Sequence, residues 1–354
     1  MPVEIINGHR LNYVQINSEQ SGDQVEDLIM VHGLATNMAF WYFQYAPAFS
    51  QRYRITLYDL RGHGRSEMTE SGYTPQNLAS DLQSLLDHLG IKRAYFIVHS
   101  FGGIIALNFA CLDPKRVAGL ILADTHIYTF RQLQGEKSWE YGKKIQSLLH
   151  QYGLDLEIHN SKFGGKLLTL MAQMQIEEKN IPENLAELII PYSGKFSNRT
   201  AMQWLNLMTN TSAENELMSE DGLTLEKLQK FNFPILSIYG ENSQAKLTGK
   251  QLLDIWPNAE FRHVRGAGHF FLTSRSDEVL TICNQFLNGE LTNNSKYRNG
   301  EDFKNYFRCE RFFKSNGKWF FFTRESTRIG PFIELNEAKK FVGSYLSKII
   351  TNDR

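Results

Sequence analysis

The sequence predicts an α/β fold, in which a mostly parallel sheet carries helices on both of its faces. From residue 11 to about residue 125, short apolar runs of strand length alternate with longer amphipathic stretches. After a long helical stretch, the same strand pattern returns between Pro234 and Val264. A sharp serine-centred turn joins one apolar run to the helix that follows it. Strands that alternate with helices indicate a parallel sheet, because the crossover connections place helices on the faces of the sheet.

The first part of the predicted sheet consists of short runs rich in β-branched and aromatic residues. These predicted strands are Leu28–Val31, Ile55–Tyr58, Tyr95–Val98 and Val117–Ala123. Two helices connect them. The first carries leucines at helical spacing and ends at Gly90, a residue suited to a helix C-terminus. The second runs from Ile104 to Cys111 and ends before the Asp113-Pro114 pair.

The middle of the chain is predicted to be a helical insertion, which in this position would form a lid over the sheet. Between residues 128 and 231 the strand signal fades, and three segments read as helices: Lys166–Gln175, Asn184–Ile190 and Thr200–Met208. The sheet then resumes with a strand at Pro234–Tyr239, a helix that ends at Trp256, a strand at Phe261–Val264 and a closing helix that ends at Leu287.

A small separate unit is predicted at the C-terminal end. Residues 289–299 are polar and rich in turn formers, which is typical of a linker. Beyond them, two aromatic runs flank Ser315-Asn316-Gly317, which indicates a β-hairpin, and Asn336 begins a final helix that ends at Ile350. The predicted division is therefore a sheet core at 1–127 and 232–288, a helical cap at 128–231, a linker at 289–299 and an aromatic-rich domain at 300–354.

Composition favours a globular protein without a membrane span. The chain has 354 residues, of which 42% are hydrophobic and 21% are charged. A core of this size needs no disulfides or metals. The three cysteines, Cys111, Cys283 and Cys309, lack metal-ligand spacing and read as free thiols of a reducing compartment. No secretory leader pattern and no apolar run of about 18 residues is present, so we expect a cytoplasmic protein.

Charge is distributed unevenly along the chain. Residues 296–354 hold 13 Lys and Arg against 7 Asp and Glu, a balance of +6, so the rest of this neutral chain carries −6. The basic side chains are spaced singly among aromatic residues and form no run. A solvated domain face is therefore the preferred interpretation, and we expect no nucleic-acid partner.

The stretch Val98-His99-Ser100-Phe101-Gly102-Gly103 predicts a nucleophile elbow. It follows an apolar strand and opens a helix, and its small residues allow strand and helix to approach each other. The usual first glycine of the G-x-S-x-G pattern is Val98 here, so a branched side chain must be accommodated at this point. We expect Ser100 to be the nucleophile.

Two further segments are expected to serve this serine. Acyl transfer needs two backbone N–H donors for the oxyanion, and we expect them at Leu34, in the loop after a strand, and at Phe101. His269 follows Gly266-Ala267-Gly268 after the last strand and is expected to be the general base. His32 reads as a structural hydrogen bonder within its loop.

Asp59 to Ser66 is rich in ionisable groups, but its glycines indicate an architectural turn that shapes the floor of the site, and His63 is not the preferred base.

These motifs resemble the α/β-hydrolase fold-1 family, the capped branch that includes esterases, lactonases and meta-cleavage-product hydrolases. The resemblance covers about residues 3 to 288 and agrees in motif order and spacing. It implies an eight-stranded sheet with a helical cap inserted after strand 6, a triad serine at Ser100 and a triad histidine at His269. It also implies that no cofactor and no metal takes part. The matching segments are the His32-Gly33 loop, Asp59 to Ser66, the Ser100 elbow, Leu122 to Thr125 and Gly266 to His269.

The third member of the triad departs from the family pattern. The acid usually follows the seventh strand in a G-x-x-D turn, which here reads Gly240-Glu241-Asn242-Ser243. A serine cannot supply the negative charge that stabilises an imidazolium. Asp124 ends the sixth strand, where relatives such as haloalkane dehalogenases place their acid, and Glu241 lies in the usual turn but two residues early. We prefer Asp124, because a carboxylate at a strand end projects from a rigid element, and keep Glu241 as the alternative.

The sequence therefore predicts a serine hydrolase that cleaves a carboxylic ester or thioester of an apolar small molecule through an acyl-enzyme. The cap supplies apolar residues whose helical spacing is typical of a packed core, although lids that cover an acyl chain show the same pattern: Met171, Met174, Trp204, Leu207 and Met208. One alternative is a carbon–carbon bond hydrolase of the same fold, which would use the same triad. Another is a non-catalytic scaffold that binds a ligand, favoured by Val98 and by the missing usual acid. Residues 300–354 are a candidate for docking an unknown partner.

Overall fold

The computed structural model describes residues 3–19, 25–127, 130, 140–151, 163–179, 197–217, 220–243, 245–256, 259–290, 312–315, 318–322, 328–334, 337 and 341. The chain divides into two compact units, Met1–Asn293 and Asn294–Arg354. The predicted limits of the core, cap, linker and C-terminal domain remain predictions.

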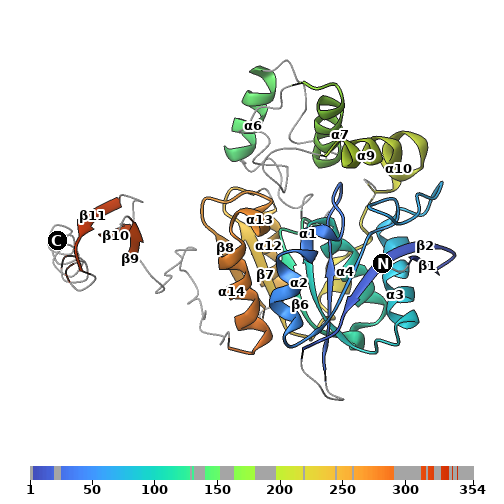
Figure 1. The fold of residues 1–354 in the computed structure, drawn as a ribbon, viewed down its shortest axis with the longest axis horizontal. Helices are drawn as coiled ribbons and strands as arrows, with labels where there is room; N and C mark the ends of the chain where they lie inside the picture. Colours follow the sequence, from blue (N-terminus) through green and yellow to red (C-terminus); the bar gives the residue numbers. More distant parts are fainter. Residues whose placement is uncertain are drawn as a thin grey trace. The chain divides into compact units, whose positions relative to one another are not determined.

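An eight-stranded sheet forms the centre of the first unit, in the order β1-β2-β4-β3-β5-β6-β7-β8 (Figure 1). The first two strands pair antiparallel with each other, and β2 also pairs antiparallel with β4. From β4 to β8 every pairing is parallel. The predicted mostly parallel sheet of eight strands is therefore confirmed. Its strands are β1 (Val3–Ile6), β2 (His9–Ile16), β3 (Asp27–Val31), β4 (Arg54–Tyr58), β5 (Ala94–His99), β6 (Val117–Ala123), β7 (Ile235–Gly240) and β8 (Glu260–Val264).

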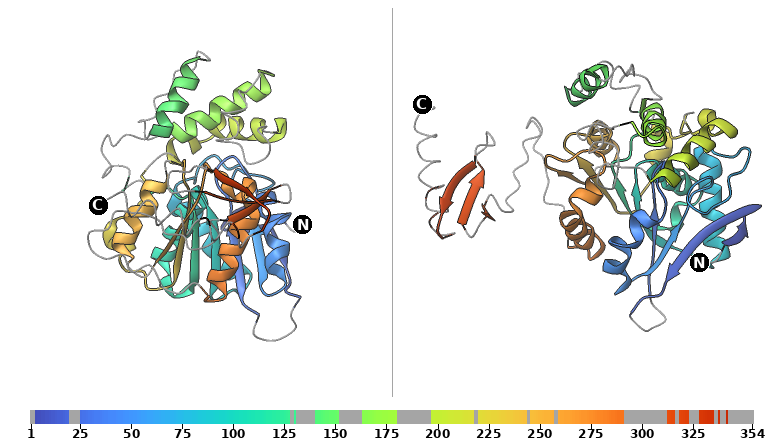
Figure 2. Two further views of the ribbon diagram at one scale, coloured as in Figure 1. Left: turned by 90° about the vertical axis from the view of Figure 1, so that its left-hand side faces the viewer. Right: turned by 45° about the horizontal axis from the view of Figure 1, so that its top comes forward.

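Helices cover both faces of this sheet (Figures 1 and 2). Thr74 caps α3 by accepting a hydrogen bond from the N–H of Asn77 at 3.2 Å, and Gly90 just beyond the helix has φ +68°. On the other face, the Tyr53 hydroxyl, in the turn between α2 and β4, donates to the carbonyl of Leu287 at the end of α14 at 3.3 Å. The helices of the core are α1 (Ala39–Tyr42), α2 (Tyr45–Ser50), α3 (Pro75–His88), α4 (Phe101–Leu112), the 3₁₀ helix η1 (Pro114–Arg116), α11 (Leu225–Leu228), α12 (Lys246–Ile255), α13 (Phe271–Ser274) and α14 (Ser276–Leu287).

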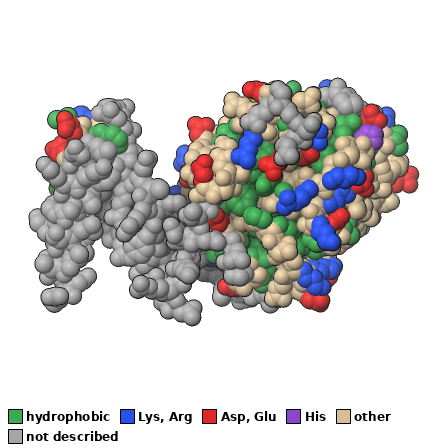
Figure 3. Space-filling view, turned by 90° about the horizontal axis from the view of Figure 1, so that it is seen from below, with side chains coloured by type: hydrophobic (Ala, Val, Ile, Leu, Met, Phe, Trp, Pro, Cys, Tyr) green, Lys and Arg blue, Asp and Glu red, His purple; other side chains and the backbone are tan. Residues whose placement is uncertain are grey.

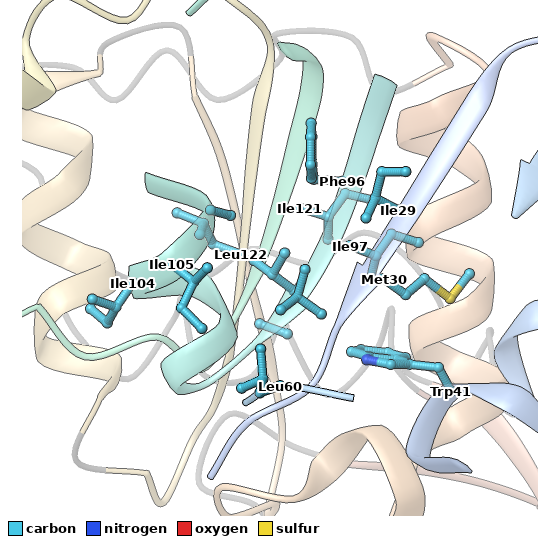
Figure 4. Close-up of a cluster of buried hydrophobic side chains, with 14 of the residues drawn as sticks. Ile29, Met30, Trp41, Leu60, Phe96, Ile97, Ile104, Ile105, Ile121 and Leu122 are labelled. Atoms are coloured by element: carbon cyan, nitrogen blue, oxygen red, sulfur yellow. The ribbon is translucent and has the colours of Figure 1, made fainter. Parts of the chain in front are cut away.

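The hydrophobic core lies between the central strands and the helices on both faces of the sheet, α4 among them. All residues of β3 and of β6 are buried, as expected for strands that are covered on both faces. Figure 4 shows part of this core, with side chains from β3, β5, β6, α1 and α4. The residues labelled there are at most 4% exposed: Ile29, Met30, Trp41, Leu60, Phe96, Ile97, Ile104, Ile105, Ile121 and Leu122.

The helical cap is inserted between β6 and β7, as predicted, and lies above the carboxyl ends of the strands in Figure 1. Its helices are α6 (Glu140–Gln151), α7 (Phe163–Ile176), α9 (Asn198–Asn210) and α10 (Ala213–Glu216). The two longer predicted cap helices correspond to α7 and α9, whereas α6 was not predicted. The predicted helix at Asn184–Ile190 lies outside the described residues.

The second unit contains a three-stranded antiparallel sheet in the order β11-β10-β9. The predicted hairpin is present, with β9 (Phe312–Ser315) pairing antiparallel with β10 (Lys318–Phe322) and Lys318 opposite Ser315. A third strand, β11 (Arg328–Phe332), was not predicted. The predicted final helix from Asn336 to Ile350 lies almost entirely outside the described residues.

Figure 3 views the molecule from the side opposite the cap. On this face of the first unit, basic and acidic side chains are interspersed with hydrophobic ones. In the described part of the chain, no helix is both long and apolar enough to cross a bilayer. Cys111 and Cys283 are free thiols, of which only Cys283 is fully buried, and Cys309 lies outside the described residues.

Candidate active site

Ser100 occupies a strained turn between a buried strand and a helix. Strand β5 ends at His99 and α4 begins at Phe101, which leaves Ser100 at the corner with φ 54° and ψ −121°. Positive φ is rarely adopted by residues with a side chain, and such strain persists only where surrounding contacts impose it. Here the Ser100 N–H donates to the Ala123 carbonyl at 2.8 Å, and the Ser100 carbonyl accepts from the Gly103 N–H at 3.0 Å.

The close approach of strand and helix occurs at Gly102 and not at Val98. A Cβ on Gly102 would lie 2.5 Å from the Val31 carbonyl oxygen, so no larger residue fits without movement. Val98 is fully buried within the sheet, opposite Val31 of β3 and Leu122 of β6. The branched residue that departs from the usual elbow pattern is therefore an ordinary core side chain.

Ser100, His269 and Asp124 form a continuous chain of contacts. His269, in the loop between β8 and α13, has Nε2 2.9 Å from the Ser100 Oγ and Nδ1 2.5 Å from Asp124 Oδ2. The Asp124 side chain is fully buried, whereas the His269 side chain is 31% exposed. An imidazole held between a hydroxyl and a buried carboxylate can take the hydroxyl proton and be stabilised when it becomes charged.

The Asp124 carboxylate is held from several sides. Its Oδ1 accepts the Gly240 N–H at 2.9 Å, and its Oδ2 accepts the Ser243 hydroxyl in addition to the contact with His269. Its own N–H donates to the Ile238 carbonyl at 2.9 Å. A buried carboxylate whose oxygens accept several donors keeps its orientation.

Glu241 is directed elsewhere. This residue is exposed, and its carboxylate accepts the Gly266 N–H at 2.8 Å. That bond braces the turn that precedes His269. Of the two acids considered from the sequence, Asp124 is the one in contact with His269.

The expected oxyanion donors flank Ser100. A Cβ on Gly33 would lie 3.0 Å from the Ser100 Cβ, so the loop containing Leu34 runs directly against the serine. Phe101 is the first residue of α4, where backbone N–H groups have no partner within the helix. Within the described residues, neither the Leu34 N–H nor the Phe101 N–H donates to another protein group.

Two buried histidines hold the loop that contains Leu34. His32 accepts the Leu60 N–H at Nε2 (3.0 Å), so its proton lies on Nδ1, 2.8 Å from the Gly33 carbonyl oxygen. His63 accepts the Ala35 N–H at Nε2 at 3.3 Å. Burial lowers the pKa of both imidazoles, that of His63 to about 4, so both are neutral near pH 7.

The Asp59–Ser66 turn is organised around the buried Asp59 carboxylate. Asp59 accepts hydrogen bonds from the Met38 N–H at 2.8 Å, the Arg65 N–H at 2.9 Å and the Asn12 amide at 2.6 Å. Gly64, with φ +55°, passes so close that a Cβ there would lie 2.2 Å from this carboxylate. These contacts link the turn to the neighbouring strand β2 and to the loop before α1.

The cap contacts the core at this same turn. Gln203 of α9 donates to the carbonyls of Gly62 and Gly64 at 3.2 and 3.0 Å. The Trp204 indole N–H donates to the Thr169 hydroxyl of α7 at 3.1 Å, which joins the two cap helices. The apolar cap residues singled out from the sequence are all at most 7% exposed: Met171, Met174, Trp204, Leu207 and Met208.

Two residues that sequence reasoning did not weigh also belong to this site. His99, quoted only as part of the elbow, is buried, and its Nε2 lies 3.0 Å from the main-chain oxygen of His269. Ser243, read only as a missing acid, donates its hydroxyl to Asp124. The position of Ser243, in the turn where the family carries its acid, was the sequence feature that could have indicated its contact with the site. In the described part of the chain, no three His, Cys, Asp or Glu side chains are grouped to hold a metal ion.

Comparison with known families agrees with this architecture. A family model described as alpha/beta hydrolase fold matches residues 28–275. A second model, described as a domain of unknown function (DUF6316), matches residues 297–351.

Individual relatives share part or most of the chain. It is 26% identical over 291 residues to the cis-3-alkyl-4-alkyloxetan-2-one decarboxylase of Shewanella oneidensis, covering 79% of this chain and 86% of that protein. It is 35% identical over 112 residues to 3-oxoadipate enol-lactonase 1 of Acinetobacter baylyi, 32% of this chain and 40% of that protein. The matches to two further curated relatives span 36% and 28% of their lengths. Among solved structures, that of Est816, described as an N-acyl homoserine lactone degrading enzyme, aligns with 26% identity and a TM-score of 0.53 over 80% of this chain and 99% of that chain.

Proposed function

Because the chain belongs to the α/β-hydrolase family, we propose that it is a serine hydrolase that cleaves a carboxylic ester, lactone or thioester of an apolar small molecule. The observation that carries the proposal is the unbroken chain of contacts from the Ser100 Oγ through the His269 imidazole to the buried Asp124 carboxylate. Each neighbouring pair is within hydrogen-bond distance without any movement of the protein.

In the first half of the proposed reaction, Ser100 attacks the carbonyl carbon. As the Oγ–carbon bond forms, His269 Nε2 takes the hydroxyl proton, and the imidazolium is stabilised by Asp124 at Nδ1. The carbonyl oxygen becomes an oxyanion held by the N–H groups of Leu34 and Phe101, which have no protein acceptor among the described residues. His269 then returns the proton to the leaving alcohol or thiol as the acyl-enzyme forms.

In the second half, water releases the acyl group. His269 takes a proton from water while the water oxygen attacks the acyl carbon, and the proton passes to the Ser100 Oγ as the acyl bond breaks. The partial exposure of His269 supports this step, because water can reach the imidazole.

The proposed substrate is apolar and of modest size. The cap is built around buried methionine, leucine and tryptophan side chains, and caps of this apolar composition suit substrates with acyl chains. Two relatives carry names that contain cyclic esters, an oxetan-2-one and a homoserine lactone. Both support the inclusion of lactones among the candidate substrates.

A panel of substrates tests the proposal. It would contain p-nitrophenyl esters of increasing acyl length, acyl thioesters, N-acyl homoserine lactones and a dienoate with a scissile carbon–carbon bond, each assayed with the wild type and with Ser100→Ala. We expect turnover of at least one ester, lactone or thioester, and its loss in Ser100→Ala. Turnover of the dienoate alone would assign the protein to carbon–carbon bond hydrolysis instead.

A further inference from the structure

We propose that His99 is a positioning residue of the hydrolytic reaction, which holds the main chain of His269 so that its imidazole stays aligned between Ser100 and Asp124. The inference rests on the proposed function. The observation behind it is the approach of His99 Nε2 to the His269 carbonyl oxygen at 3.0 Å, across 170 residues of sequence.

The protonation state of His99 follows from this contact. A carbonyl oxygen only accepts, so Nε2 must carry the proton and Nδ1 must be bare. Nδ1 is buried and has no hydrogen-bond partner within the described residues. Burial also lowers the pKa of His99 well below its ordinary value, and a charged His269 lowers it further. His99 therefore stays neutral while His269 gains and loses its proton, and the Nε2–H donor persists through the reaction.

The position of the His99 ring is itself constrained. The ring is fully buried and stacks on Phe40, with centroids 5.1 Å apart and planes 15° from parallel. The ring also contacts the rings of His269 and Phe270, with centroids 4.8 and 5.5 Å away. A donor fixed in this way restrains the carbonyl that it binds.

The glycine-rich loop before His269 is held at Gly266 by Glu241 and at Ala267 by the Asn242 N–H, and the His99 contact adds a restraint at His269 itself. Gly266 and Gly268 precede it, and Gly266 has φ +64°. A hydrogen bond at the carbonyl of His269 fixes the peptide plane between His269 and Phe270, next to the Cα that carries the imidazole. Misplacement of a catalytic group by about 1 Å can lower the rate about 100-fold.

A pair of substitutions separates this role from simple packing. His99→Gln keeps a side-chain N–H that can reach the His269 carbonyl, whereas His99→Leu fills a similar volume without a donor. Because Nδ1 has no partner, the glutamine sacrifices no other hydrogen bond. The measurements are kcat and KM on an active ester, the rate of labelling by a fluorophosphonate, and the unfolding midpoint of each variant.

We expect His99→Leu to lower kcat and the labelling rate by about 10- to 100-fold with KM nearly unchanged. His99→Gln should recover most of that loss. If both variants lose activity equally, or if His99→Leu labels at the wild-type rate, the proposal is overturned. If His99→Leu does not fold, His99→Met takes its place in the same comparison, because methionine adapts to irregular core space. Failure of the wild type itself to react would overturn the proposed function and not this inference alone.

Discussion

At the scale of single residues, the carboxylate in contact with His269 comes from the end of β6 and not from the turn after β7. Ser243 stands where the family carries its aspartate, and its hydroxyl donates to Asp124, which occupies the end of β6. The two positions therefore lie on either side of one hydrogen bond. A second carboxylate at position 243 would repel the Asp124 carboxylate, so one carboxylate at this place is compatible with a serine at the other position.

Asp124 is accordingly expected to be the acid of the triad, and Glu241 is the matched control. Asp124→Asn should lower kcat by about 1,000- to 10,000-fold, because the neutral amide no longer stabilises the imidazolium. Glu241→Gln should change kcat by less than about tenfold, since its carboxylate binds the Gly266 N–H and not His269. The reverse ranking would make Glu241 the acid.

The relation between the two positions predicts a rescue. Adding Ser243→Asp to Asp124→Asn restores a carboxylate at the usual family position, close to the same imidazole. We expect the double variant to be at least about tenfold faster than Asp124→Asn alone. Ser243→Asp in the wild-type background should slow the enzyme. Steady-state kinetics on one ester tests both expectations. If the double variant is no faster than Asp124→Asn, a carboxylate at position 243 cannot replace the one at position 124.

The buried His63 predicts a loss of stability in acid. The unfolded chain takes up a proton on this residue below about pH 6.5, but burial holds the folded pKa at about 4. The free energy of unfolding should therefore fall as the pH drops through this window, by on the order of 3 kcal/mol from His63. His32 and His99, whose pKa values are also lowered, act in the same direction.

Urea unfolding at about pH 7 and about pH 4 measures this effect. His63→Gln, whose side-chain oxygen can accept the Ala35 N–H, should show a smaller difference between the two pH values than the wild type. An equal difference in both proteins would mean that His63 does not contribute.

At the scale of secondary-structure elements, the elbow depends on the distance between α4 and β3. Gly102→Ala would place a Cβ 2.5 Å from the Val31 carbonyl oxygen, and a backbone atom cannot move aside as the end of a side chain can. We expect a loss of about 1–3 kcal/mol in stability, together with a fall in kcat as Ser100 shifts.

Gly164→Ala is the matched control, because nothing lies within 4 Å of a Cβ at that position in α7. Its effect should stay within about 1 kcal/mol. Thermal unfolding and ester hydrolysis of both variants test the prediction, which fails if Gly102→Ala is as well tolerated as Gly164→Ala.

Sequence periodicity predicted the elements that carry a strong local pattern. The apolar runs became β3 to β7 within one or two residues, because buried parallel strands are largely apolar along their length. Strand β8 was also located to within one residue, although most of its residues are only partly buried. The contact between His99 and His269 could not be predicted, since it joins residues 170 positions apart through a main-chain atom. The choice between Asp124 and Glu241 likewise depended on side-chain direction, which spacing alone does not determine. Strand β11 was missed because its Gly330-Pro331 pair interrupts the strand pattern.

At the scale of the whole molecule, the chain separates into two compact units at residues 293 and 294. The Ser100, His269 and Asp124 side chains all lie in the first unit. We expect a chain that ends at Asn293 to keep hydrolytic activity within about twofold of the full chain. Its unfolding midpoint, compared with that of the full chain, checks that the first unit remains folded. Loss of activity in a folded truncated protein would show that residues 294–354 contribute to the site.

The most direct test of the proposed chemistry is the intact mass of the full chain after incubation with a fluorophosphonate, which reports an activated serine without knowledge of the substrate. We expect a single adduct on the wild type, none on Ser100→Ala, and much slower formation on His269→Ala and Asp124→Asn. The absence of an adduct on folded wild-type protein, or an adduct that persists in Ser100→Ala, would contradict the assignment of Ser100 as the nucleophile.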